Sequence, residues 1–201
     1  MKINENLNLV LPLREDEEGN PLLYGFHTPI SREIFESCFR IIAATKASIF
    51  GKGFVFAADT GPRIASLTLK DEGRRDAESR GDVDEQGNPK DGGATALLAE
   101  IRRLTLILAP TQQGWDMIPV ETALHSDILD EEEWREAESS LVFFTCPYAL
   151  ATKAVRVNLA SAIASVLKGS ITSSPVSEYA AFLQKSTAKQ DSAKKGSSVP
   201  S

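Results

Sequence analysis

The sequence predicts a mainly helical α+β protein, in which an N-terminal β-hairpin precedes a bundle of about five to six helices. Every second residue from 7 to 13 is a leucine, with Asn6, Asn8, Val10 and Pro12 between them, and this period of two is typical of a half-buried strand. Several later segments repeat apolar residues at spacings of three and four, as amphipathic helices do. The chain has 201 residues, of which 42% are hydrophobic, and this is enough for one core. We therefore expect a single globular domain over residues 1–185.

The hairpin is predicted over residues 6–28. One face of its first strand carries four leucines: Leu7, Leu9, Leu11 and Leu13. After an acidic turn, DEEGN, the segment PLLYGFHT is suited to be the return strand. Pro12 cannot donate a ladder hydrogen bond, so we expect an outer edge at that position.

A long helix is predicted to begin at Ser31. The Ser31 hydroxyl can accept a hydrogen bond from the first turn, and Ile30 can pack on Phe35 as a hydrophobic staple. The buried stripe comprises Ile34, Cys38, Ile41, Ile42, Thr45 and Ile49. Gly51 and Gly53 supply the end of this helix. Another helix is expected to start near Pro62, a residue that suits a first helical turn.

Residues 72–93 are dense in charge and glycine, and they are predicted to form a mobile, solvated loop. Part of the loop, DVDEQGNPKDGG, resembles the start of an EF-hand, with Asp82, Asp84 and Gly87 in place. Its twelfth position is Gly93 instead of a bidentate glutamate, so we expect no calcium site. The hexapeptides DEEGNP and DEQGNP are interpreted as two turns and not as a duplicated unit.

The second half of the chain is predicted to be helical. One helix runs from residue 94 until Pro110 ends it, with Arg102 and Arg103 on a solvated face. The later helices are expected over residues 119–125, 130–146, 151–169 and 174–186. Residues 186–201 contain no anchoring side chain and are predicted to be disordered.

The acidic run that begins at Asp130 could indicate paired catalytic carboxylates or a cation site. A structural interpretation accounts for it, because Asp130 and Glu133 have the spacing of a capping box. Carboxylates in a first helical turn are also favoured by the helix dipole. We therefore assign this run no chemistry.

Net charge and hydropathy exclude several classes of partner. The formal charge is −6 and the isoelectric point is near 5.1, which argues against binding to nucleic acid or to an anionic membrane. No apolar run approaches the roughly 20 residues needed to span a bilayer. The chain start alternates instead of forming a signal-peptide core. A cytoplasmic location is therefore expected.

Catalytic and metal-binding residues are not evident. Cys38 and Cys146 each lie in an apolar run and are predicted to be buried thiols. His27 and His125 belong to no catalytic or metal-ligand motif, so they are interpreted as structural or surface residues. The sequence thus predicts a protein that is not an enzyme and has no cofactor and no metal.

Four segments carry a resemblance to a known family. They are the N-terminal hairpin followed by TPISREIFE, then GPRIASLTLKD, then LLAEIRRLTLILAPTQQGWDMIPVETAL, and finally LDEEEWREAESSLVFFT. This pattern, over most of residues 5–150, resembles the tail assembly chaperones of long-tailed, siphovirus-like bacteriophages. The resemblance implies a protein of the host cytoplasm that coats the tape measure protein, keeps it soluble and recruits tail-tube (major tail) subunits. It implies no catalytic residue, and a homo-oligomer stays open.

Partner contacts are expected at apolar residues that the core does not need. The candidates are Phe54, Phe56 and Trp115, with packing in the core as the alternative for each. Two rival functions stay open. A structural tail or connector subunit would be present in the virion and would normally show more strands. An enzyme or regulator outside phage biology would need a pocket with convergent polar groups.

Overall fold

A computed structural model describes residues 7–112 and 114–184, and within these ranges the chain forms one five-stranded antiparallel sheet and eight helices. The strand order is β4-β3-β2-β1-β5. The strands are β1 (Asn8–Glu15), β2 (Pro21–His27), β3 (Thr105–Thr111), β4 (Gly114–Pro119) and β5 (Ser170–Thr172). The fold is α+β with a sheet larger than a hairpin, so the expected hairpin followed by a helical bundle is wrong.

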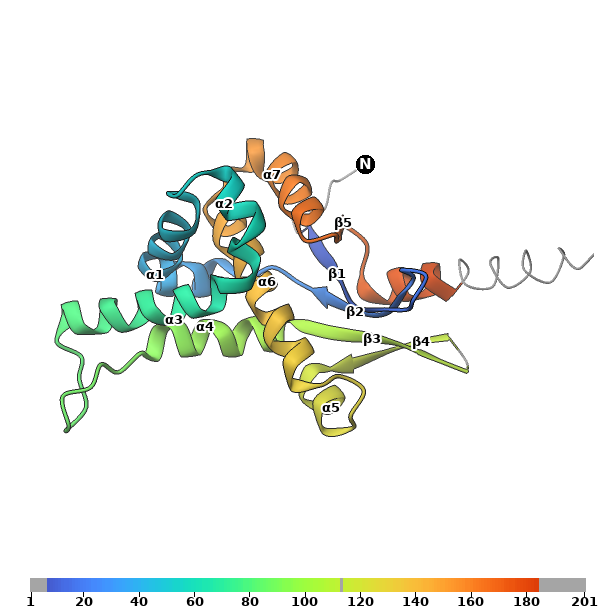
Figure 1. Ribbon diagram of the computed structural model, residues 1–201, viewed down its shortest axis with the longest axis horizontal. Helices are drawn as coiled ribbons and strands as arrows, with labels where there is room; N and C mark the ends of the chain where they lie inside the picture. The colour runs from blue at the N-terminus through green and yellow to red at the C-terminus, as the bar shows by residue number, and fades with distance from the viewer. Residues whose placement is uncertain (1–6, 113, 185–201) are drawn as a thin grey trace, which may run out of the picture.

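Within the described ranges, four helices lie between β2 and β3 in the sequence, three lie between β4 and β5, and one follows β5. They are α1 (Arg32–Phe50), α2 (Phe54–Asp59), α3 (Gly61–Arg80), α4 (Gly92–Arg103), α5 (Val120–His125), α6 (Glu131–Leu150) and α7 (Lys153–Val166), followed by a helix over residues 176–184. Helices α1 to α4 gather at one side of the molecule and the strands at the other, with α6 crossing between them (Figure 1).

Strand β3 is the main error in the predicted fold. Its sequence, TLILAPT, was expected to continue a helix up to Pro110, yet α4 ends at Arg103. A short apolar run fits a strand and a buried helix equally well by periodicity alone. Here it pairs with β2, where Tyr24 lies opposite Leu108, and with β4. Strands β4 and β5 were not expected either.

Helix α3 also extends further than predicted, because it continues to Arg80 and the following turn begins at Gly81. Residues 72–80 are therefore helical and not part of a loop. Small residues allow this charged segment to pack, since Ala77 is fully buried and a side chain at Gly73 would collide with Ala94 of α4. Its charges form surface ion pairs, such as Arg80 with Asp76 at 2.9 Å.

Short sequence motifs predicted the ends of several other elements correctly. Strands β1 and β2 form the expected hairpin, with Leu9 opposite His27. Ser31 caps α1 by accepting a hydrogen bond from the amide of Ile34. Asp130 and Glu133 form a complete capping box at the start of α6. These motifs act within a few residues, so the fold around them does not alter them.

The two similar hexapeptides form the same turn. Asp16 accepts hydrogen bonds from the amides of Glu18 and Asn20, and Asp84 accepts them from the amides of Gln86 and Asn88. The third residue after each aspartate is a glycine at positive φ, 79° at Gly19 and 83° at Gly87. The interpretation of both as turns is confirmed. The predicted disorder of 186–201 lies outside the described residues.

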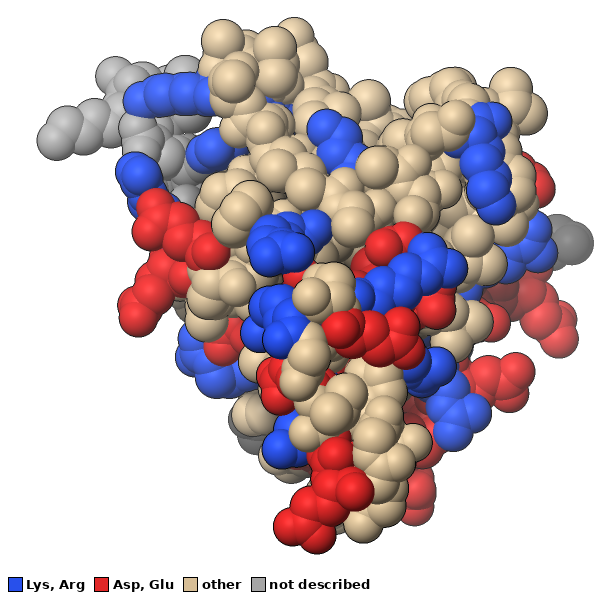
Figure 2. Space-filling model, turned by 90° about the vertical axis from the view of Figure 1, so that its left-hand side faces the viewer, with Lys and Arg blue, Asp and Glu red and all other residues tan. Residues whose placement is uncertain are grey.

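The main core lies between the helices and one face of the sheet. Its largest fully buried side chains include Phe143, Phe144, Leu9 and Ile107. Cys38 and Cys146 are both buried free thiols, which confirms that prediction. Acidic and basic side chains are interspersed over the face in Figure 2, and its upper part is largely uncharged.

Candidate functional site

The three expected contact residues lie in two separate places. Phe54 is 73% exposed, whereas Phe56 is half-buried beneath the ammonium group of Lys52, 4.9 Å from its ring centroid. Both belong to α2, which packs on α1 and α3. Trp115 is half-buried in β4, with its ring centroid 5.5 Å from that of Tyr24. The fold therefore does not join the three residues into one surface.

Helix α2 presents two adjacent apolar side chains to solvent. Val55 is 82% exposed beside the 73% exposed Phe54, while Ala57 alone of this six-residue helix is fully buried. Single exposed apolar residues are ordinary on protein surfaces. A neighbouring pair of this size has no role in the packing of the fold.

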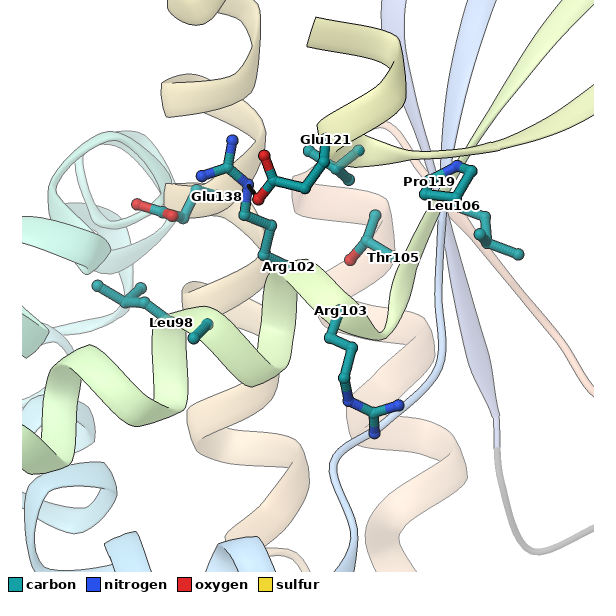
Figure 3. Close-up of a pocket in the computed structure, with 10 residues that line it drawn as sticks. Leu98, Arg102, Arg103, Thr105, Leu106, Pro119, Glu121 and Glu138 are labelled. Atoms are coloured by element: carbon teal, nitrogen blue, oxygen red, sulfur yellow. Dashed lines mark ion pairs between the residues drawn. The ribbon is translucent and has the colours of Figure 1, made fainter. Parts of the chain in front are cut away.

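A cavity of about 660 Å³ lies where α4, β3, α5 and α6 meet (Figure 3). Its apolar lining consists of Leu98, Ala99, Leu106, Pro119 and Val120. Its polar lining consists of Arg102, Arg103, Thr105, Glu121 and Glu138. The cavity thus brings together charged side chains from α4, α5 and α6.

Arg102 organises the charged side of the cavity. Its Nε lies 2.9 Å from Oε1 of Glu121 on α5, and the two side chains point toward one another in Figure 3. The guanidinium carbon lies 5.5 Å from the ring centroid of Trp134, which is a cation–π contact. Arg102 was expected on a solvated face, but its side chain is only 30% exposed, because β3 and α5 fold back over the end of α4.

Glu138 is a largely buried carboxylate beside this pair, with its side chain 15% exposed. Burial raises its pKa, while the positive charges of Lys70 and Arg102 and a hydrogen bond from Trp134 act in the opposite direction. The ammonium of Lys70 lies 3.9 Å away. Glu138 also lines a second hollow of about 610 Å³ between α3 and α6, next to Leu67, which is 65% exposed.

The chemistry available in the cavity is that of an ion network. Arginine and glutamate side chains there pair with one another, and Thr105 uses its hydroxyl to donate to the Ile101 carbonyl at 2.7 Å. No serine, cysteine or histidine lines the cavity. Within residues 7–112 and 114–184, no group of three or more His, Cys, Asp or Glu side chains could hold a metal ion.

The two histidines have structural surroundings. His27 is fully buried, and its Nδ1 lies 3.0 Å from the Thr105 hydroxyl, which already donates its proton to Ile101. Nδ1 of His27 must therefore be the protonated nitrogen. Burial lowers the pKa of His27 to about 4. His125 is exposed at the end of α5, where Nδ1 lies 2.6 Å from the carbonyl of Glu121.

The sheet has a second apolar face, turned away from the main core. Because side chains alternate along each strand, the pairing places two rows of apolar residues on this face. The first row is Val10, Phe26, Leu106 and Pro119, and the second is Pro12, Tyr24, Leu108 and Met117. Trp115, opposite Pro110, extends the face toward the β3–β4 turn. The segments TLILAPT and GWDMIP are apolar at most positions of both faces, so their pattern does not mark this face in the sequence.

The helix over residues 176–184 packs on this second face. Val176, Tyr179 and Leu183 contact a small separate core made by Val10, Phe26 and Leu108. The rings of Phe26 and Tyr179 lie 6.0 Å apart. Other residues of the face stay accessible, including Met117, which is 44% exposed, and Leu22, which is 41% exposed.

Comparisons with known proteins identify no relative. No family model matches the chain, and no curated protein and no solved structure is significantly similar to it. In the part of the chain that the structure describes, none of the helices is long and apolar enough to cross a membrane.

Proposed function

We propose that this chain is a phage tail assembly chaperone that binds the tape measure protein in the host cytoplasm, keeps it soluble and helps to recruit tail-tube subunits. The proposal takes its partner from the sequence resemblance over residues 5–150. Its action is that of a binding protein, with no catalytic step. An acidic protein with apolar contact sites can cover an apolar partner and keep the complex soluble.

The observation that carries the proposal is the exposed pair Phe54 and Val55 on α2. Large apolar side chains that the fold leaves in water are candidates for the anchors of a protein interface. Lys52 precedes this helix and Asp59 is its last residue, so the apolar surface has a polar rim. Such a rim around an apolar centre is the usual anatomy of an interface.

Coexpression with the tape measure protein of the same genome tests this function. The expected result is a soluble, copurifying complex, and insoluble tape measure protein when this chain is absent. The double variant Phe54→Ser, Val55→Ser should weaken the complex, because it removes both anchors. The control Arg32→Ser, Glu36→Ser alters an exposed ion pair on α1 and should leave the complex intact.

A structural tail or connector subunit is the second candidate. The five-stranded sheet favours it, since such subunits are rich in strands and β4 leaves one long edge of the sheet available for pairing. Purified virions separate the two functions. A chaperone is absent from mature particles, whereas a subunit is present in stoichiometric amount.

A further inference from the structure

We propose that the second face of the sheet, beside the helix over residues 176–184, docks one amphipathic helix of a partner protein. The contacts would be made by Met117, Leu106 and Pro119, with Trp115 at one end. The identity of the partner, the tape measure protein, rests on the proposed function. The surface itself rests on the geometry of the sheet.

The width of the sheet leaves room for a second helix. Five strands with spacings of about 4.8 Å make a sheet roughly 19 Å wide, whereas a helix with its side chains is about 10 Å wide. One helix, over residues 176–184, is present on this face. This helix packs on Val10, Phe26 and Leu108, with Trp115 beside them. The neighbouring part of the face, around Leu106, Met117 and Pro119, stays accessible.

The exposure of the strand residues agrees with an accessible surface. In β3 and β4 the core-facing Ile107 is fully buried, and its neighbour on the second face, Leu106, is only half-buried. Met117 is 44% exposed and Pro119 is also exposed. These residues are adjacent on the sheet, since Leu106 pairs with Pro119 and Leu108 pairs with Met117.

The helix over residues 176–184 shows which kind of side chain packs on this face. It meets the sheet through Val176, Tyr179, Ala180 and Leu183, which are spaced as one face of a helix. The rest of the sequence offers no equivalent segment. Residues 1–6 and 185–201 contain only Met1, Ile3 and Val199 as large apolar side chains. These residues lack the apolar spacing of the helix over 176–184, and we assign the accessible part of the face to a partner.

Charge gives the docked helix a direction. The β1–β2 and β3–β4 turns lie at the same end of the sheet, because the residues around them pair in antiparallel register. The first of these turns carries four consecutive acidic residues, Glu15 to Glu18. A docked helix with lysine or arginine at that end is complementary to it.

A synthetic peptide tests the surface independently of the biological partner. The probe is a helical peptide of about 14 residues, or about 21 Å, made of Leu, Ala and Lys with leucines at i, i+3, i+4 and i+7. Titrated into ¹⁵N-labelled protein, it should shift amide signals of β3, β4 and residues 176–184. A peptide of the same composition without this periodicity should not.

Two matched variants sharpen the test. Met117→Lys should weaken peptide binding by about tenfold or more, because it places a charge in the apolar contact. Val157→Lys replaces an apolar residue of similar exposure on α7, 47% against 44% for Met117, and should leave peptide binding unchanged. The proposal would be overturned by any of three results: amide shifts centred on α2, equal binding of the two peptides, or peptide binding that Met117→Lys leaves unchanged. A wild-type dimer that Met117→Lys makes monomeric would also overturn it, because a second copy would occupy the face.

The same variants with the tape measure protein separate this inference from the proposed function. If wild type binds and Met117→Lys does not, both stand. If wild type binds and Met117→Lys binds equally well, the docking surface is wrong and the chaperone function stands. If wild type fails to bind the tape measure protein but binds the peptide at β3 and β4, the surface stands and the proposed function is wrong.

Discussion

Arg14 of β1 holds Glu133 of α6 through two hydrogen bonds, Nε to Oε1 and Nη2 to Oε2, each 2.6 Å long. Oε2 of Glu133 also accepts the Asp130 amide in the capping box at 3.0 Å. One carboxylate thus starts a helix and fastens that helix to the sheet. The pair joins residues that are 119 positions apart in the sequence.

Replacing Glu133 by glutamine should therefore destabilise the protein by about 1–2 kcal/mol at pH 7, because a bidentate charged pair is lost. The hydrogen bonds of Arg14 lower the pKa of Glu133 below its ordinary value of 4.5. The contribution of Glu133 to stability is therefore present above pH 4.5 and is lost as pH falls through the folded pKa. Urea unfolding should show the wild-type and variant free energies converging below pH 4.5. Glu131→Gln, in the same turn but exposed, should have a much smaller effect.

The buried His27 should make the protein sensitive to acid. Its folded pKa of about 4 lies below the ordinary 6.5, so the unfolded chain binds a proton first as pH falls. Stability should then decrease from pH 6.5 to pH 4, by about 3 kcal/mol if the whole shift is expressed. His27→Gln should flatten this slope in chemical denaturation, even if it lowers stability at pH 7. The control His125→Gln leaves the buried ring of His27 in place, so the dependence of stability on pH should not change.

Gly61 is required by the packing of α3 against α6. A Cβ atom at this position would lie 2.6 Å from Cε2 of Phe143 and 3.0 Å from Cγ2 of Ile49. Gly61→Ala should destabilise the protein by about 1–3 kcal/mol, since overpacking outweighs the gain in helix propensity. At Gly92, the first residue of α4, a Cβ meets nothing within 4 Å. Thermal unfolding of Gly92→Ala should show unchanged or slightly higher stability.

Calcium should leave the melting temperature unchanged. The carboxylate of Asp84 is already used by its own turn, with Oδ1 accepting the amides of Gln86 at 2.9 Å and Asn88 at 2.8 Å. A ligand that bound only the folded state would raise stability by RT ln(1 + [L]/Kd). A calcium-dependent rise that Asp82→Ala abolishes would contradict the interpretation of this segment as a turn.

The sequence by itself determined the features whose partners lie within a few residues. The cap at Ser31, the capping box of Asp130 and Glu133, and the matching turns at Asp16 and Asp84 all follow from side chains that bond to nearby amides. These bonds depend little on the rest of the fold. The N-terminal hairpin belongs to the same group, because its strands are joined by one short turn.

Only the tertiary structure decided which conformation the segment after Arg103 adopts. The apolar run after Arg103 fits the pattern of a helix and that of a strand equally well. It forms a strand because it pairs with β2, where Leu108 lies opposite Tyr24, 84 positions away in the sequence. That choice also brings Arg102 to Glu121 and leaves Met117 on the outer face of β4 44% exposed. The physical reason is that ladder hydrogen bonds and burial are gained from strands distant in sequence, and no local pattern records where those strands lie.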